Sequence, residues 1–268
     1  MKTTIIIVIA YLVASFSAQS QSHFEKELND IKKILIEQIP GTILIMQSKD
    51  NYIRIKTDKE VPKVTDERAK GLKPVNSNID NTGLGLALLQ SGSNITLMAS
   101  SQINNDYNYT IYIPQEVEVS ANYTSPFGGK KIEIHDLSNP IEVKTLSANV
   151  KFEQITGPAV FHSISGDIEG TFSTLSQESP SSITSVSGII DVALPPSTGA
   201  NLSLKSISGE IYTGFDIKLK KEASAKKGRA KGLPQIGGMG NETKGSINEG
   251  GVNLDLQSIS GNIYLRDK

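Results

Sequence analysis

The chain has three histidines, the side chains best suited to bind a metal or to move protons near neutral pH. They are His23, His135 and His162, and none has a second histidine or a carboxylate at metal-ligand spacing. The chain has no cysteine, which excludes thiol catalysis, a disulfide framework and a lipoprotein anchor. No G-x-S-x-G segment is present to make a serine nucleophile. We therefore expect no metal and no cofactor.

Carboxylates are the remaining groups that could do chemistry, because two acids across a groove can hydrolyse a glycosidic bond. Asp167 and Glu210 each follow the glycine of a similar short segment, but Ile189 and Asn262 occupy that position in two other segments. Two further acids, Asp191 and Asp255, lie elsewhere in the pattern. Since solvated acids beside turns are far commoner than catalytic pairs, we predict no catalytic residue and no enzymatic activity.

Basic residues gather in one segment, at 218–250. They are Lys218, Lys220, Lys221, Lys226, Lys227, Arg229 and Lys231, with glycines following at 237, 238 and 240. This composition predicts a flexible basic insertion that is solvated. The alternative is a contact with anionic envelope material, for which Lys226, Lys227 and Arg229 are candidates. Without interleaved aromatic residues, and in a nearly neutral chain of 27 basic and 28 acidic residues, the cluster predicts no nucleic-acid partner.

A short repeat positions these residues. Similar six-residue corner segments begin at 136, 145, 154 and 163, in steps of nine, and again at 185, 206 and 258. The clearest copies read Ser-Ile-Ser-Gly or Ser-Val-Ser-Gly. Nine residues are enough for one strand and one corner, so two such units would make one coil of a stacked β-solenoid. An ordinary antiparallel sandwich whose hairpins share Ser-Gly turns is the alternative.

The side chains around each corner predict an inner and an outer face. Leu202 and Leu204 alternate before one corner, as a strand with one apolar face requires. The apolar parity changes after the corner, which predicts that Ile164, Val186 and Ile207 also point inward. The repeat position just before the corner serine is polar in every clear copy. His162, Lys205 and Gln257 occupy it and form our candidate binding surface.

The N-terminus predicts export. Lys2, the apolar run 5–13 and Ala18-Gln19-Ser20 have the order of a secretory signal peptide, which we place at 1–20. The run is too short to span a membrane, and no later run is long enough, so we predict no transmembrane segment. The mature protein is expected in the periplasm, on the outer surface or outside the cell.

The rest of the chain divides into a cap and one domain. Residues 21–40 are predicted to contain a short helix, because Phe24, Leu28, Ile31 and Leu35 recur every three or four residues before Pro40. Residues 41–268 are predicted to form the solenoid domain.

The order of motifs along this domain also resembles a known family. The motifs are Gly41-Thr42-Ile43, Gly71-Leu72-Lys73-Pro74, the segments 80–86, 250–254 and 262–265, and the S-x-S-G-x-I corners. Together they resemble the bacterial putative adhesins, exported β-helix-like domains of unknown function. The resemblance covers nearly all of the mature chain, with Ala148 replacing one corner glycine, and implies no catalytic residues.

These observations predict an exported, non-enzymatic, adhesin-like scaffold that binds a protein or polysaccharide of the cell envelope or surface. A periplasmic modulator of an envelope-stress or surface-maintenance system is the alternative. A polysaccharide-acting solenoid enzyme is a more distant one.

Overall fold

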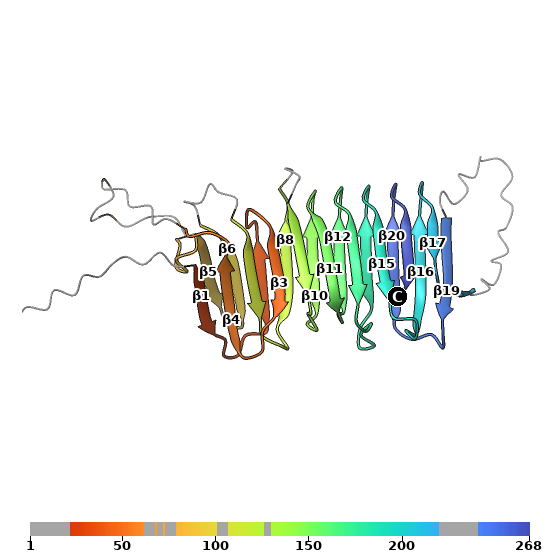
Figure 1. The fold of residues 1–268 in the computed structure, drawn as a ribbon, viewed down its shortest axis with the longest axis horizontal. Helices are drawn as coiled ribbons and strands as arrows, with labels where there is room; N and C mark the ends of the chain where they lie inside the picture. Colours follow the sequence, from red (N-terminus) through yellow and green to blue (C-terminus); the bar gives the residue numbers. More distant parts are fainter. Residues whose placement is uncertain are drawn as a thin grey trace, which may run out of the picture.

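The computed structural model describes residues 22–61, 68, 72, 79–100, 107–125, 130–219 and 241–268. All elements of this part of the chain are β-strands, so the all-β prediction is confirmed. The strands form two large sheets that extend along the long axis of the molecule (Figure 1). Neighbouring strands are parallel through the body of both sheets and antiparallel only near the two ends. This parallel pairing excludes the antiparallel sandwich.

In spatial order the ten-stranded sheet contains β1 (His23–Glu27), β4 (Tyr52–Thr57), β7 (Tyr109–Ile113), β3 (Ile43–Gln47), β9 (Lys131–His135), β11 (Asn149–Ile155), β13 (Ile168–Phe172), β15 (Ile190–Leu194), β21 (Ile263–Asp267) and β17 (Ile211–Thr213). The eleven-stranded sheet contains β18 (Lys218–Leu219), β19 (Asn241–Ile247), β16 (Ala200–Ser206), β20 (Asn253–Ser258), β14 (Ser181–Ser185), β12 (Ala159–Ser163), β10 (Ile141–Thr145), β8 (Glu118–Tyr123), β2 (Lys33–Glu37), β6 (Asn94–Ala99) and β5 (Leu86–Ser91). From β7 to β17 successive strands alternate between the two sheets.

The nine-residue steps of the sequence correspond to this alternation. Corners at 136 and 154 lie at the ends of β9 and β11 in the ten-stranded sheet, whereas those at 145 and 163 end β10 and β12 in the other. Asp136 and Gln154 adopt positive φ angles of 51° and 55°, a turn conformation. The Ser-x-Ser-Gly corners follow only strands of the eleven-stranded sheet.

The first serine of each Ser-x-Ser-Gly corner is buried and stabilises the corner. Its Oγ accepts a hydrogen bond from the N–H of the glycine three residues later, at 2.8 Å in the Ser163 and Ser185 corners. The two residues between serine and glycine therefore project into solvent. Ile164, Val186 and Ile207 are all exposed, so the prediction that they point inward was wrong. Two other side chains of each corner point inward instead. One is the serine directly before the exposed residue, and the other is the aliphatic residue four positions after it, such as Ile168 and Ile190.

Close packing explains why these corners need glycine. Corners of neighbouring strands are stacked, with the Val186 and Ser187 amides donating to the carbonyls of Ser163 and Ile164. A Cβ on Gly166, Gly188 or Gly261 would overlap the carbonyl oxygen of the corner beneath it. None of these three glycines has a positive φ, so close backbone approach, not the left-handed conformation, requires them.

We expect Gly188→Ala to lower the free energy of unfolding by about 1–3 kcal/mol, because its methyl group would displace a packed backbone. The midpoint of urea unfolding measures this. The adjacent Ile189→Ala, at a side chain that is 38% exposed, is the matched control and is expected to stay within about 0.5 kcal/mol of the wild type. Equal midpoints for the two variants would contradict the packing argument.

The N-terminal helix is not found. Residues 23–27 and 33–37 instead form the strands β1 and β2, separated by a turn in which Asp30 has a φ of 59°. Ile34 and Ile36 are buried at alternate positions, between β8 and β6. β-Branched residues at a spacing of two favour a strand once neighbouring strands supply hydrogen bonds, and this tertiary pairing overrides the three- and four-residue apolar spacing.

The final strands of the chain lie inside the stack, not at its end. β20 pairs with β14 on one side and β16 on the other, and β21 lies between β15 and β17. In Figure 1 the C-terminus accordingly lies within the row of strands, with β16, β17 and β19 beyond it. The N-terminal part has a similar arrangement, since β2 and β3 lie between strands that come later in the chain.

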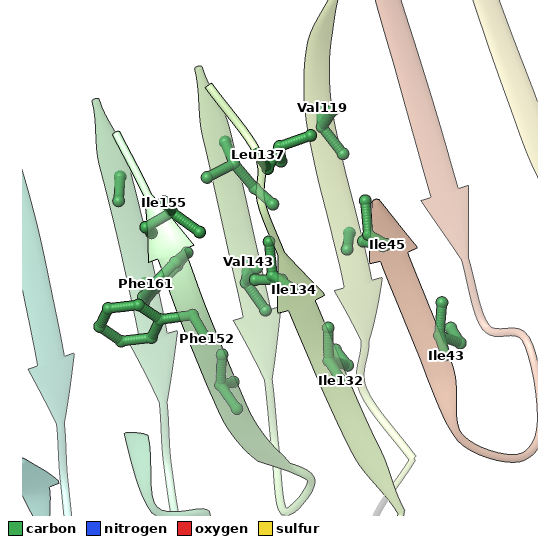
Figure 2. Close-up of a cluster of buried hydrophobic side chains, with 14 of the residues drawn as sticks. Ile43, Ile45, Val119, Ile132, Ile134, Leu137, Val143, Phe152, Ile155 and Phe161 are labelled. Atoms are coloured by element: carbon green, nitrogen blue, oxygen red, sulfur yellow. The ribbon is translucent and has the colours of Figure 1, made fainter. Parts of the chain in front are cut away.

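One continuous hydrophobic core fills the space between the sheets. Figure 2 shows Ile132, Ile134 and Phe152 from the ten-stranded sheet with Val143 and Phe161 from the eleven-stranded sheet. Alternate residues of most strands in the body of the two sheets are buried in this way, as expected for sheets with one solvated face.

Two predicted segments lie wholly or partly outside the described residues. The signal peptide at 1–20 is outside them, as is 220–240 of the predicted basic insertion. The flanks of that insertion form β18 and β19, which pair with each other, and β19 also pairs with β16. No helix in the described part of the chain is long and apolar enough to cross a membrane.

Candidate functional site

The outer face of the eleven-stranded sheet carries a row of aligned polar side chains. In strand order this polar row is Lys144, His162, Thr184, Gln257 and Lys205. Strand pairing places each residue directly beside the next, about 4.8 Å away. The three described residues of the predicted binding surface, His162, Lys205 and Gln257, thus share one row. The other three, Lys226, Lys227 and Arg229, lie outside the described residues.

A second row runs beside the first along the corner tips. This aliphatic row is Leu146, Ile164, Val186, Ile259 and Ile207. Leu146 is half-buried, and the other four expose between 37% and 48% of their surface. Each residue follows a buried serine or threonine whose hydroxyl caps the corner, as Thr145 does for Ala148 at 2.8 Å. The corner geometry therefore holds all five aliphatic side chains on the outside of the molecule.

The two rows line one groove. Its volume is about 620 Å³, within the range of small-molecule sites. The walls come from six stacked strand ends, from Thr124 at one end to Lys205 and Ile207 at the other. Most of the exposed lining surface of the groove is apolar. The groove is thus linear, with aliphatic side chains along one side and polar groups along the other.

Positive charge predominates among the ionisable groups of the groove, whose lining has two lysines and a histidine and no carboxylate. Lys144 is bound to Glu142 outside the lining, and this hydrogen bond holds the pKa of Glu142 below its ordinary value. Lys205 lies beside Glu242, but Glu242 is paired with Lys244 at 2.8 Å. The Lys244 hydrogen bond lowers the pKa of Glu242, and Lys205 adds to this from a longer distance. Among the described residues Lys205 makes no ion pair, so its ammonium can still pair with an anion at that end of the groove.

Similar folds occur in solved bacterial proteins. One is a putative cell adhesion protein from Clostridium sporogenes, with a TM-score of 0.44 and 10% identity, covering 92% of this chain and 99% of the other. A putative adhesin from Bacteroides fragilis has a TM-score of 0.43 and 11% identity, covering 92% and 96%. Both of these solved proteins are described as putative adhesion proteins. No protein-family model and no curated protein matches the chain. At this level of identity and TM-score these likenesses assign no function.

The acids considered for catalysis do not converge. Asp167 and Glu210 belong to corners separated by two others, so three strand intervals of about 4.8 Å lie between them. That separation of roughly 14 Å exceeds the spacing of glycosidase acid pairs. The carboxylate of Asp167 also has a structural partner, because its Oδ1 accepts a hydrogen bond from the Ile189 N–H at 2.8 Å.

The remaining two acids are on opposite sheets. Asp191 lies on β15, in a bidentate pair with Arg266 at 2.6 Å, and Asp255 lies on β20. No cluster of three or more potential metal-binding side chains occurs in the described residues. None of these four acids lines the groove, so its described lining presents no acid pair for hydrolysis.

Sequence reasoning missed the aliphatic row. A signal for it was present, because serine at the first position and glycine at the fourth mark a tight turn whose two central residues face outward. An aliphatic residue at the second position of such a turn, repeated in Ile164, Val186, Ile207 and Ile259, is therefore exposed.

Proposed function

We propose that this protein is an exported, non-enzymatic β-solenoid scaffold that binds a cell-envelope or cell-surface component in an adhesin-like way. The proposed binding surface is the groove between the polar row and the aliphatic row. One observation carries the proposal: five equivalent positions on stacked strands present the same pair of features, a polar side chain beside an aliphatic one. Such a surface is not needed for the core, which lies on the opposite side of these strands.

The repetition supports recognition through many weak contacts, whose combined affinity exceeds that of any one of them. The signal-peptide pattern of residues 1–20 supports export. The separation of Asp167 from Glu210 supports a role without hydrolysis.

The test is binding of the purified protein to bacterial envelope fractions, measured before and after substitution of the polar row. A single hydrogen bond contributes about 0.5–1.5 kcal/mol. We therefore expect His162→Ala or Gln257→Ala to weaken binding about two- to tenfold, and the triple variant that adds Lys205→Ala to weaken it at least about tenfold.

The control is a pair of changes on the outer face of the other sheet, Lys151→Ala with Glu169→Ala, which are neighbours on β11 and β13. They should leave binding unchanged. Loss of binding in this control as large as in the triple variant would refute the proposed surface, and so would the absence of any binding to envelope fractions.

A further inference from the structure

The aliphatic row exposes apolar surface that the fold itself does not require. Ile164, Val186, Ile207 and Ile259 lie outside the buried core, and the hydrogen bonds of their corners come from serine and glycine. The corner therefore requires the backbone amide of each tip residue but not its aliphatic side chain. A contiguous exposed aliphatic strip rimmed by polar residues marks a protein contact, a membrane contact or a ligand-binding groove.

Most backbone groups beneath the row already have hydrogen-bond partners, which restricts the kind of ligand. The amides of Ile164, Val186 and Ile259 donate to the carbonyls of Thr145, Ser163 and Ser185 in the neighbouring corners. The carbonyls of Leu146, Ile164, Val186 and Ile259 accept from the serine amides of the next corner. An extended peptide lying in the groove would lose water from its own backbone groups and gain no backbone partners, which is costly. A hydrocarbon chain has no such groups to satisfy.

The shape and charge of the groove agree with one extended chain that carries an acidic head. From Leu146 to Ile207 the row crosses four strand intervals, about 19 Å. Lys205, whose ammonium is not in an ion pair with a described residue, flanks the Ile207 end. Lys144 at the other end is paired with Glu142. An anionic head would therefore be placed beside Lys205, with the chain extending toward Leu146.

A second copy of the protein is a poorer occupant. Two aliphatic rows packed about a twofold axis at Val186 would place Lys205 of each copy opposite the Lys144–Glu142 pair of the other. Because that pair is already neutral, the interface would bury Lys205 without a counter-charge.

We propose that the groove binds the acyl chain of a monomeric long-chain fatty acid, with its carboxylate beside Lys205. This inference rests on the proposed binding function of the same surface and specifies its ligand. The apolar lining supplies the attraction, and the lysine supplies the direction of the chain.

The experiment loads the purified full-length protein with the fluorescent fatty acid cis-parinaric acid and adds palmitate at concentrations below its micellar concentration. The loss of cis-parinaric acid fluorescence measures its displacement. We expect saturable binding with one site per chain. Val186→Asp should weaken palmitate binding at least tenfold, because it places a charge at the centre of the aliphatic row. Lys205→Gln should weaken palmitate about three- to tenfold but leave the uncharged 1-hexadecanol unaffected.

Ile189→Asp is the matched control. It lies in the same corner as Val186, is likewise 38% exposed, and is outside the groove lining. It should bind palmitate as the wild type does, and circular dichroism of both variants should show an unchanged fold. Absence of saturable palmitate binding, or equal loss in both aspartate variants, overturns the fatty-acid assignment.

Envelope fractions and vesicles separate this inference from the proposed function. Envelope binding that depends on Val186 without palmitate binding would retain the function and replace the ligand with another partner, such as an acidic protein segment. Palmitate binding without envelope binding would retain the ligand and refute the adhesin-like function. Binding to phosphatidylglycerol vesicles but not to monomeric palmitate would make the aliphatic row a membrane contact. It would overturn the assignment of the groove to a single fatty-acid molecule.

Discussion

Deletion of residues 253–268 is expected to unfold the C-terminal part of the stack, although it removes only β20 and β21. Each of these strands is hydrogen-bonded on both sides, β20 between β14 and β16, and β21 between β15 and β17. Their inward residues Leu254, Leu256, Ile263 and Leu265 are at most 1% exposed. Without them, β16 and β17 lose the strands that join them to the rest of both sheets.

The expected loss is large compared with the stability of a domain. Truncation of one buried leucine or isoleucine to alanine typically costs about 2–5 kcal/mol, and four such residues would be lost together with two hydrogen-bonded strands. The sum is about as large as the 5–15 kcal/mol that stabilises a typical domain. Hydrogen exchange should show rapid exchange in β16 and β17 of the truncated protein, and thermal unfolding should occur at a much lower temperature or without a cooperative transition.

A shorter deletion provides the control. Removing only Asp267 and Lys268, both exposed, leaves the buried residues in place and should change the free energy of unfolding by less than about 1 kcal/mol. If the longer deletion also retained native protection in β16, the final strands would not be holding the two parts of each sheet together.

Phe152→Ala is expected to destabilise the protein by about 3–5 kcal/mol, the usual cost of removing a buried phenylalanine side chain. Phe152 is fully buried between the sheets, with its ring centroid 5.3 Å from the rings of both Phe161 and Phe172. Gly170 lies directly opposite it on β13, and a Cβ there would overlap the Phe152 ring. The site is therefore shaped around this ring, and the loss would leave a cavity and remove two aromatic contacts.

Urea unfolding measures this effect, with Ile207→Ala as the comparison. Ile207 is 37% exposed at a corner tip, so its truncation should cost less than about 1 kcal/mol. Similar costs for the two variants would mean that the corner aliphatic contributes to the core after all.

The repeat chemistry of this protein could be predicted from the sequence, because it is local. Nine residues suffice for a strand and a corner, and the alternation of Leu202 with Leu204 identifies the inward face without any knowledge of neighbours. The same alignment placed His162, Lys205 and Gln257 at one repeat position, and strand pairing then brought them into one row.

Only the tertiary structure decided three other features. At 23–37 the neighbouring strands β4, β6 and β8 supply the hydrogen bonds that turn an apparently helical spacing into β1 and β2. At the corners, stacking onto the carbonyl of the preceding corner leaves no room for a Cβ on Gly188. The order of strands was also undetermined, since each repeat offers similar backbone edges and similar buried aliphatics. Nothing local distinguishes β16 from β20 as the neighbour of β14, so that choice depends on how all the strands pack together. The same choice makes the groove continuous across Val186, Ile259 and Ile207.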